Sequence, residues 1–138
     1  MVPLTRFVLA AIACLAADAD DPTEIDFASL SDFTWVQGMK LPEHVTKWNE
    51  KKVRISGFME RDGAGVGPVD YFMLINDSCG CEGTPMMNEI IFCDMPPGQQ
   101  TDILPGVVTI EGKLFVGEVE EDGVVLSIYN FDVDRVTQ

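Results

Sequence analysis

Positive charge is scarce in this sequence: 9 lysines and arginines stand against 23 aspartates and glutamates, which gives a formal net charge of −14. A surface that binds nucleic-acid phosphates needs clustered Lys and Arg, so the composition argues against a nucleic-acid-binding domain. Anionic membrane surfaces are disfavoured for the same reason. The nearest basic cluster comprises Lys47, Lys51, Lys52 and Arg54, and Glu50 interrupts it. We therefore interpret this cluster as a solvated edge.

Histidine is almost absent, since His44 is the only one in 138 residues. Ser-His-Asp catalysis would have to use it, and the chain has no Gly-x-Ser-x-Gly nucleophile turn. The glycine-rich segment 62–68 lacks the Lys-Ser/Thr of a phosphate-binding loop, and so it indicates a hairpin turn. The acidic segments 118–122 and 132–134 lack the glycine-centred loop of an EF-hand. We recognise no catalytic constellation and expect a protein that binds rather than turns over a substrate.

The chain also lacks an apolar run long enough to span a bilayer. The N-terminal run over residues 7–17 follows Arg6 and precedes small residues, which is the layout of a secretory signal peptide. We predict a signal peptide over residues 1–19, with cleavage after Ala17 as a close alternative. The mature protein is then periplasmic or secreted. The rival interpretation is lipoprotein processing at Cys14.

The predicted mature chain begins with a polar lead and arm over residues 20–40, followed by a β domain over residues 41–138. We expect residues 20–24 to be disordered and residues 25–36 to dock on the domain. Residues 41–50 predict one short helix, because Pro42 suits a first helical position and Leu41, Val45 and Trp48 share one helical face.

Five strands are predicted after this helix. Segments 51–60 and 107–120 alternate apolar and polar residues, as half-buried strands do. Segments 70–77 and 88–95 are more continuously apolar, which is typical of strands covered on both sides. The apolar phase of segment 123–136 shifts near Ser127, which indicates a bulge.

Two glycines, Gly57 and Gly112, fall inside predicted strands, where they indicate sharp bends. Residues 121–123 predict a tight hairpin between the last two strands. We therefore predict a mainly β fold, a small five-stranded OB-like barrel preceded by a short helix. The helix usual between the third and fourth strands of such a barrel is replaced by a loop over residues 95–106. The alternative is an open sandwich.

Four segments resemble, in the same order, an uncharacterised family of exported bacterial domains: LPEHVTKWNEKKVRISGFM, YFMLINDSCGC, PMMNEIIFCDM and VTIEGKLFV. The likeness covers roughly residues 27–136. It implies that Cys79 matches the family cysteine and that Cys81 stands where many members have histidine. Asn88, Glu89 and Ile90 match the family's Asn-Gln-Ile. The family's proline run is reduced to Pro85. The resemblance implies export and fold more than an activity.

The remaining chemistry lies in the cysteines. Cys79 and Cys81, separated by Gly80, are candidate thiolate ligands of zinc or copper. Nearby methionines favour Cu(I), a soft ion. Exchange of Cys with His at the family position agrees with metal binding, because both residues bind these ions. The candidates that complete the metal site are Cys93, Met86, Met87 and His44.

Two alternatives remain open for the same thiols. An exported compartment favours a structural disulfide from Cys93 to Cys79 or Cys81, in which case the domain is a non-catalytic interaction module with a protein partner. The Cys79-Gly80-Cys81 pair can instead close into a strained, easily reduced disulfide, which suits a thiol-redox partner.

Overall fold

The computed structural model describes residues 21–76 and 83–138. Each of the five predicted apolar segments forms one strand, because the apolar residues of each segment can be buried on one or both faces of a pleated sheet. The strands are β2 (Lys51–Glu60), β3 (Tyr71–Ile75), β4 (Ile90–Asp94), β5 (Val107–Glu121) and β6 (Val124–Thr137).

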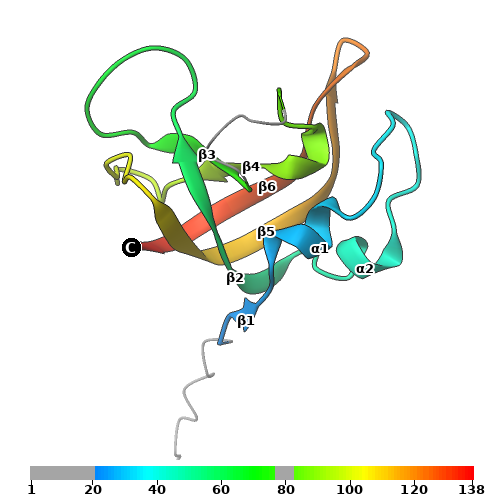
Figure 1. The fold of residues 1–138 in the computed structure, drawn as a ribbon, viewed down its shortest axis with the longest axis horizontal. Helices are drawn as coiled ribbons and strands as arrows, with labels where there is room; N and C mark the ends of the chain where they lie inside the picture. The colour runs from blue at the N-terminus through cyan, green and yellow to red at the C-terminus, as the bar shows by residue number, and fades with distance from the viewer. Residues whose placement is uncertain (1–20, 77–82) are drawn as a thin grey trace, which may run out of the picture.

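The five strands hydrogen-bond in a closed ring (Figure 1). β2 pairs antiparallel with both β3 and β5, β3 pairs antiparallel with β4, β4 pairs parallel with β6, and β6 pairs antiparallel with β5. The ring confirms the predicted OB-like barrel, because an open sandwich would leave edge strands unpaired. Residues 95–106 contain no helix, as predicted.

The barrel core takes alternate side chains from each strand, and the predicted inward positions are confirmed. Leu114 is fully buried, and Val116 is partly buried against the core. The other predicted inward positions, all buried, are Val53, Ile55, Gly57, Met59, Val108 and Ile110. Glu111 and Lys113 point outward from β5, because they alternate with these residues.

The connection between β5 and β6 confirms the predicted tight hairpin. Glu121 pairs with Val124, and the two residues between them have positive φ angles, 51° at Asp122 and 80° at Gly123. Positive φ at both central residues defines a type I′ turn, which Asp-Gly favours. The predicted bulge is also present, because the β5–β6 register shifts opposite Ser127.

The N-terminal residues are more ordered than the sequence predicted. Residues 23 and 24 form β1 (Thr23–Glu24), which runs parallel to β2, so the prediction of disorder was wrong there. Helix α1 (Phe27–Ser31) was not predicted. Its N-cap is Asp26, whose Oδ1 accepts a hydrogen bond from Ser29 N at 2.7 Å. The helix buries Phe27 and Leu30, and Tyr129 Oη donates to Leu30 O at 2.7 Å. The arm therefore docks through a short helix.

The helix predicted over residues 41–50 is shorter in the structure, where α2 spans Glu43–Thr46. The chain leaves the helix because its next polar groups pair with β5 instead. Asn49 Oδ1 accepts from Val116 N at 2.9 Å, and Glu50 N donates to Leu114 O at 2.7 Å. Glu50 also has a positive φ of 60°, which ends a right-handed helix.

The two in-strand glycines lie where strands approach closely. A Cβ at Gly112 would be 2.0 Å from Asp132 O and 2.8 Å from Phe131 Cε1. A Cβ at Gly57 would be 2.8 Å from Ile75 O and 2.9 Å from Leu74 Cγ. Gly57 precedes the point where β2 passes from pairing with β5 to pairing with β3. Both positions are therefore closed to any side chain.

We predict that Gly57→Val or Gly112→Val lowers the free energy of unfolding by a few kcal/mol, because each forces backbone atoms apart. Urea unfolding of both variants is the measurement. Ser56→Val is the matched control, since Ser56 is exposed on the same strand as Gly57. Midpoints unchanged by both glycine substitutions would contradict the close strand approach.

Glu111 joins two strands on the outside of the barrel. Its Oε1 accepts from Arg54 Nε at 2.7 Å, and its Oε2 lies 2.5 Å from Arg135 Nη2. The Glu111 side chain is only 12% exposed. The hydrogen bond from Arg54 is the main cause of a pKa for Glu111 below its usual value of 4.5, and Arg135 acts in the same direction.

A carboxylate with a lowered pKa stabilises the fold above its usual pKa, and this stabilisation is lost as the pH falls through the folded-state value. We therefore expect Glu111→Gln to unfold more easily than wild type at neutral pH, with the difference shrinking as the pH falls below 4.5. Urea unfolding across this pH range is the test, with exposed Glu120→Gln as control. A difference that grows in acid would refute the assignment.

Candidate functional site

Of the predicted thiol ligands, Cys79 and Cys81 lie outside the described residues, and Cys93 is a free cysteine in the barrel core. Cys93 pairs with Phe72 and Phe131 on the neighbouring strands, and all three are fully buried. Burial raises the pKa of its thiol well above the usual value. The disulfide alternative, in which Cys93 bridges to the loop, receives no support from this arrangement.

Cys93 is also displaced from the loop along the strand. The loop follows β3, whose last residue, Ile75, pairs with Ile90. Cys93 is three residue pairs further along this ladder, or about 10 Å at the rise of a β-strand. Its side chain points into the core, whereas that of Ile90 points outward. Cys93 therefore contributes to the packing of the barrel core.

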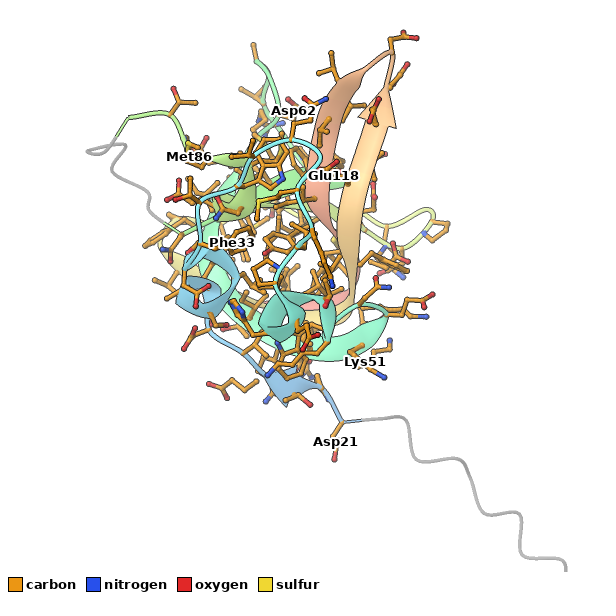
Figure 2. All side chains as sticks on the ribbon, turned by 90° about the vertical axis from the view of Figure 1, so that its right-hand side faces the viewer. Asp21, Phe33, Lys51, Asp62, Met86 and Glu118 are labelled. Atoms are coloured by element: carbon orange, nitrogen blue, oxygen red, sulfur yellow. The ribbon has the colours of Figure 1, made fainter. Side chains whose placement is uncertain are left out.

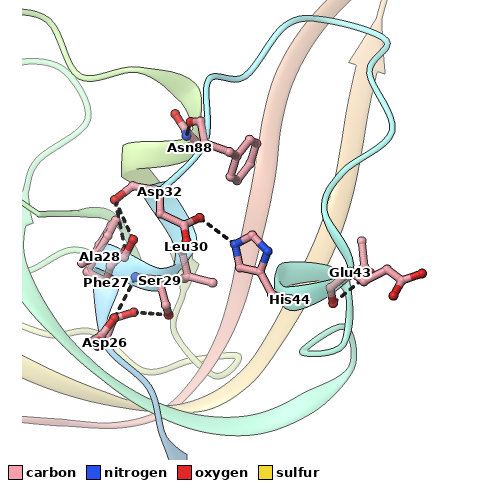
Figure 3. A network of polar contacts seen from close by, with 12 residues as sticks. Asp26, Phe27, Ala28, Ser29, Leu30, Asp32, Glu43, His44 and Asn88 are labelled. Carbon is pink, nitrogen blue, oxygen red and sulfur yellow. Dashed lines mark hydrogen bonds and ion pairs between the residues drawn. The ribbon is translucent and has the colours of Figure 1, made fainter.

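The other predicted ligands have separate surroundings. His44 Nε2 lies 2.6 Å from Asp32 Oδ1, and its ring meets that of Phe33 edge-on (Figure 3). Met86 is half-exposed, and Met87 packs against the core. In residues 21–76 and 83–138, no three His, Cys, Asp or Glu side chains are grouped as a metal site would require.

The segment that follows the cysteine loop is fixed by two residues that the family resemblance singled out. The 3₁₀ helix η1 (Met87–Glu89) contains Asn88, which is 2% exposed and donates from Nδ2 to Phe33 O at 2.6 Å (Figure 3). Glu89 Oε2 accepts from Met86 N at 2.7 Å. Asn88 thus ties the end of the loop to the N-terminal arm, and Glu89 caps the helix.

A site that the sequence did not predict lies on the outside of β3 and β4. Side chains alternate across a strand, so residues between the buried Phe72, Leu74, Ile91 and Cys93 face outward. The rings of Tyr71 and Phe92 stack there, with centroids 6.4 Å apart and planes at 21°. We define the outer apolar face as Phe58, Tyr71, Met73, Ile75, Ile90 and Phe92. Ile75 is buried, and the other five side chains are partly buried.

This face differs from the middle of β5. Three consecutive outward positions of β5 hold the polar or charged residues Thr109, Glu111 and Lys113, as expected for a solvated face. Next to Phe58, the outward Val107 is 55% exposed and continues the outer apolar face. Within the described chain, α1 and α2 pack near β2 and β5 and not over β3 or β4 (Figure 1).

Carboxylates border the outer apolar face. Asp94 pairs in register with Tyr71 on one side and with Asp132 on the other. Burial, followed by the charges of Asp62 and Asp94, raises the pKa of Tyr71 to about 12. Burial also raises the pKa of Asp94, and the charges of Asp132 and Asp70 add to the effect. The aromatic pair therefore stands in a negative potential.

Basic side chains collect elsewhere. Lys52 forms an ion pair with Asp134, and Arg54 and Arg135 share Glu111. A shallow cleft of about 370 Å³ opens at the β1 end of the barrel, where Lys51 and Asp21 lie far from Asp62 (Figure 2). The cleft is lined by Asp21, Thr23, Lys47, Trp48, Lys51 and Lys52. None of the helices in the described part of the chain could cross a membrane.

Comparison with known proteins defines the fold. No protein-family model and no curated protein matches the sequence. The structure is similar to a DUF3299 family protein from Pseudomonas aeruginosa, with a TM-score of 0.58 and 18% identity over 85% of this chain and 95% of that one. The barrel thus shares its fold with a member of a domain-of-unknown-function family.

Weaker likenesses are to the S. pombe Stn1–Ten1 complex and to a putative aspartyl-tRNA synthetase from Leishmania major. The first has a TM-score of 0.39 and 15% identity over 86% of this chain and 77% of that one. The second has a TM-score of 0.41 and 11% identity over 89% of this chain and 22% of that one.

Proposed function

We propose that this chain is an exported, non-catalytic binding domain, related to the DUF3299 domains, that docks a protein partner on its outer apolar face. The observation that carries the proposal is the stacked Tyr71–Phe92 pair within a row of outward apolar side chains. Five of the six side chains of this face remain partly accessible, and contiguous accessible apolar side chains on a protein surface are a feature of interaction sites. The signal-peptide pattern over residues 1–19 supports export.

The geometry of the face suits docking better than catalysis. Tyr71 and Phe92 are diagonal neighbours on adjacent antiparallel strands, so the sheet itself holds their rings in position. A partner that covers them gains apolar burial and aromatic contacts without first ordering these side chains.

The test uses a short synthetic peptide in which leucine alternates with serine, added to isotopically labelled protein. We expect amide chemical shifts to change in β3 and β4, and Phe92→Thr to abolish the changes because it removes half of the aromatic pair. Leu126→Thr is the control, since Leu126 is 47% exposed on the β5–β6 hairpin.

Shifts that move on the hairpin, and that disappear in Leu126→Thr rather than Phe92→Thr, would place docking elsewhere and overturn the proposal. Both variants change exposed or half-buried positions, so their thermal melts should stay close to that of wild type.

We propose a second function for the loop, the binding of zinc or Cu(I) by Cys79 and Cys81. Two thiols separated by one glycine can face a single ion. The observation that favours this function is that the loop is held at its far end, where Asn88 and Glu89 fix η1 beside the half-exposed Met86. A loop that has one end already fixed loses less conformational entropy when it binds an ion.

We expect reduced wild-type protein to hold about one ion per chain, and Cys79→Ser to lose most of it in native mass spectrometry. Cys81→His should retain much of the binding, since imidazole also binds these ions. Affinity should rise with pH until the thiols are ionised, because the ion displaces their protons. Equal metal content in wild type and Cys79→Ser excludes this function, and a Cys79–Cys81 disulfide in native protein would favour the redox alternative.

A further inference from the structure

The outer apolar face has a charge pattern that specifies its partner. We infer that it binds a protein segment that carries lysine or arginine beside apolar side chains. This inference rests on the proposed docking function and adds the chemistry of the partner.

The first step is the position of the carboxylates. Asp94 is directly opposite Tyr71 in the β3–β4 ladder, and Glu60 is opposite Met73 in the β2–β3 ladder. Asp62 and Asp70 stand at the two ends of the loop that joins β2 to β3, and both are exposed. These four carboxylates border the same stretch of apolar side chains.

The second step is that, among the described residues, no cation forms an ion pair with these four carboxylates. Arg61 is the one base in the loop between β2 and β3, and its Nη2 donates to Gly67 O at 2.6 Å. At the far edge of the face, Lys113 is opposite Asp132. Away from the face, Lys52 pairs with Asp134, and Arg54 and Arg135 pair with Glu111. Lys51 lines the cleft at the β1 end of the barrel. The carboxylates therefore remain available to an incoming cation.

The third step is the match between the rings and a cation. Guanidinium and ammonium groups are attracted to aromatic faces and to carboxylates. The outer apolar face offers the first in the rings of Tyr71 and Phe92 and the second in the carboxylates at its border. Phosphates of nucleic acid or of an anionic bilayer would be repelled by the same carboxylates. Charge complementarity thus selects a basic protein segment, whose apolar residues cover the remainder of the face.

The test compares three synthetic peptides, in which leucine alternates with lysine, with serine or with glutamate. Affinity is measured by fluorescence anisotropy at low and at high salt. We expect the lysine peptide to bind about tenfold more tightly than the serine peptide, and more weakly as salt is added. The glutamate peptide should bind least.

The variants separate charge from apolar contact. Asp62→Asn with Asp94→Asn should reduce the advantage of the lysine peptide to about twofold and flatten its salt dependence. The control is Glu120→Gln with Asp122→Asn, which removes the same charge from the β5–β6 hairpin and keeps a residue that tolerates positive φ at position 122. This control should leave the preference unchanged.

The outcomes distinguish the inference from the function on which it rests. If the lysine and serine peptides bind equally and Phe92→Thr abolishes both, docking stands and the basic partner is refuted. If Phe92→Thr leaves all binding intact, the docking function itself fails. If labelled single-stranded DNA binds the protein directly and Phe92→Thr abolishes that binding, the assignment to a protein segment is overturned.

Discussion

The close approach of β5 to β6 at Gly112 is the constraint on which the barrel depends. Asp132 O occupies the space that a Cβ would need, so the two strands can run side by side through the bend only if residue 112 has no side chain. The bend allows β5 to pair with β6 on one side and β2 on the other, at the same residue. Closure of the ring then leaves β3 and β4 as the wall furthest along the ring from β5.

This closure decides what each strand presents to solvent. In a ring of five strands the interior is filled by one set of alternate side chains, and the opposite set points outward. In the middle of β5 the outward residues Thr109, Glu111 and Lys113 are polar or charged, and Glu111 pairs with Arg54 on β2 and with Arg135 on β6. On β3 and β4 the outward set is apolar, although the same physical rule would favour polar residues there.

Much of the fold was predictable because its signals are local. Alternation identified the strands and Asp122-Gly123 the hairpin, and the in-strand glycines marked positions where strands approach too closely for a side chain. Helix α1 was missed because it has five residues and depends on tertiary contacts, such as the hydrogen bond from Tyr129 to Leu30. Its one local signal was Asp26 three residues before Ser29, a capping pair. The burial of Cys93 could not be predicted either, since spacing does not show which face of a strand a thiol occupies.

The outer apolar face accounts for the continuously apolar pattern of the second and third predicted strands, now β3 and β4. Segments 70–77 and 88–95 are continuously apolar, which is typical of strands covered on both faces. The barrel core supplies one cover, through Phe72, Leu74, Ile91 and Cys93. In residues 21–76 and 83–138, no helix supplies the other. Five of the six side chains of the outer apolar face are partly buried, and Ile75 is buried, so the face retains some accessible apolar surface. We propose that a partner supplies the second cover, because docking would remove this remaining surface from water.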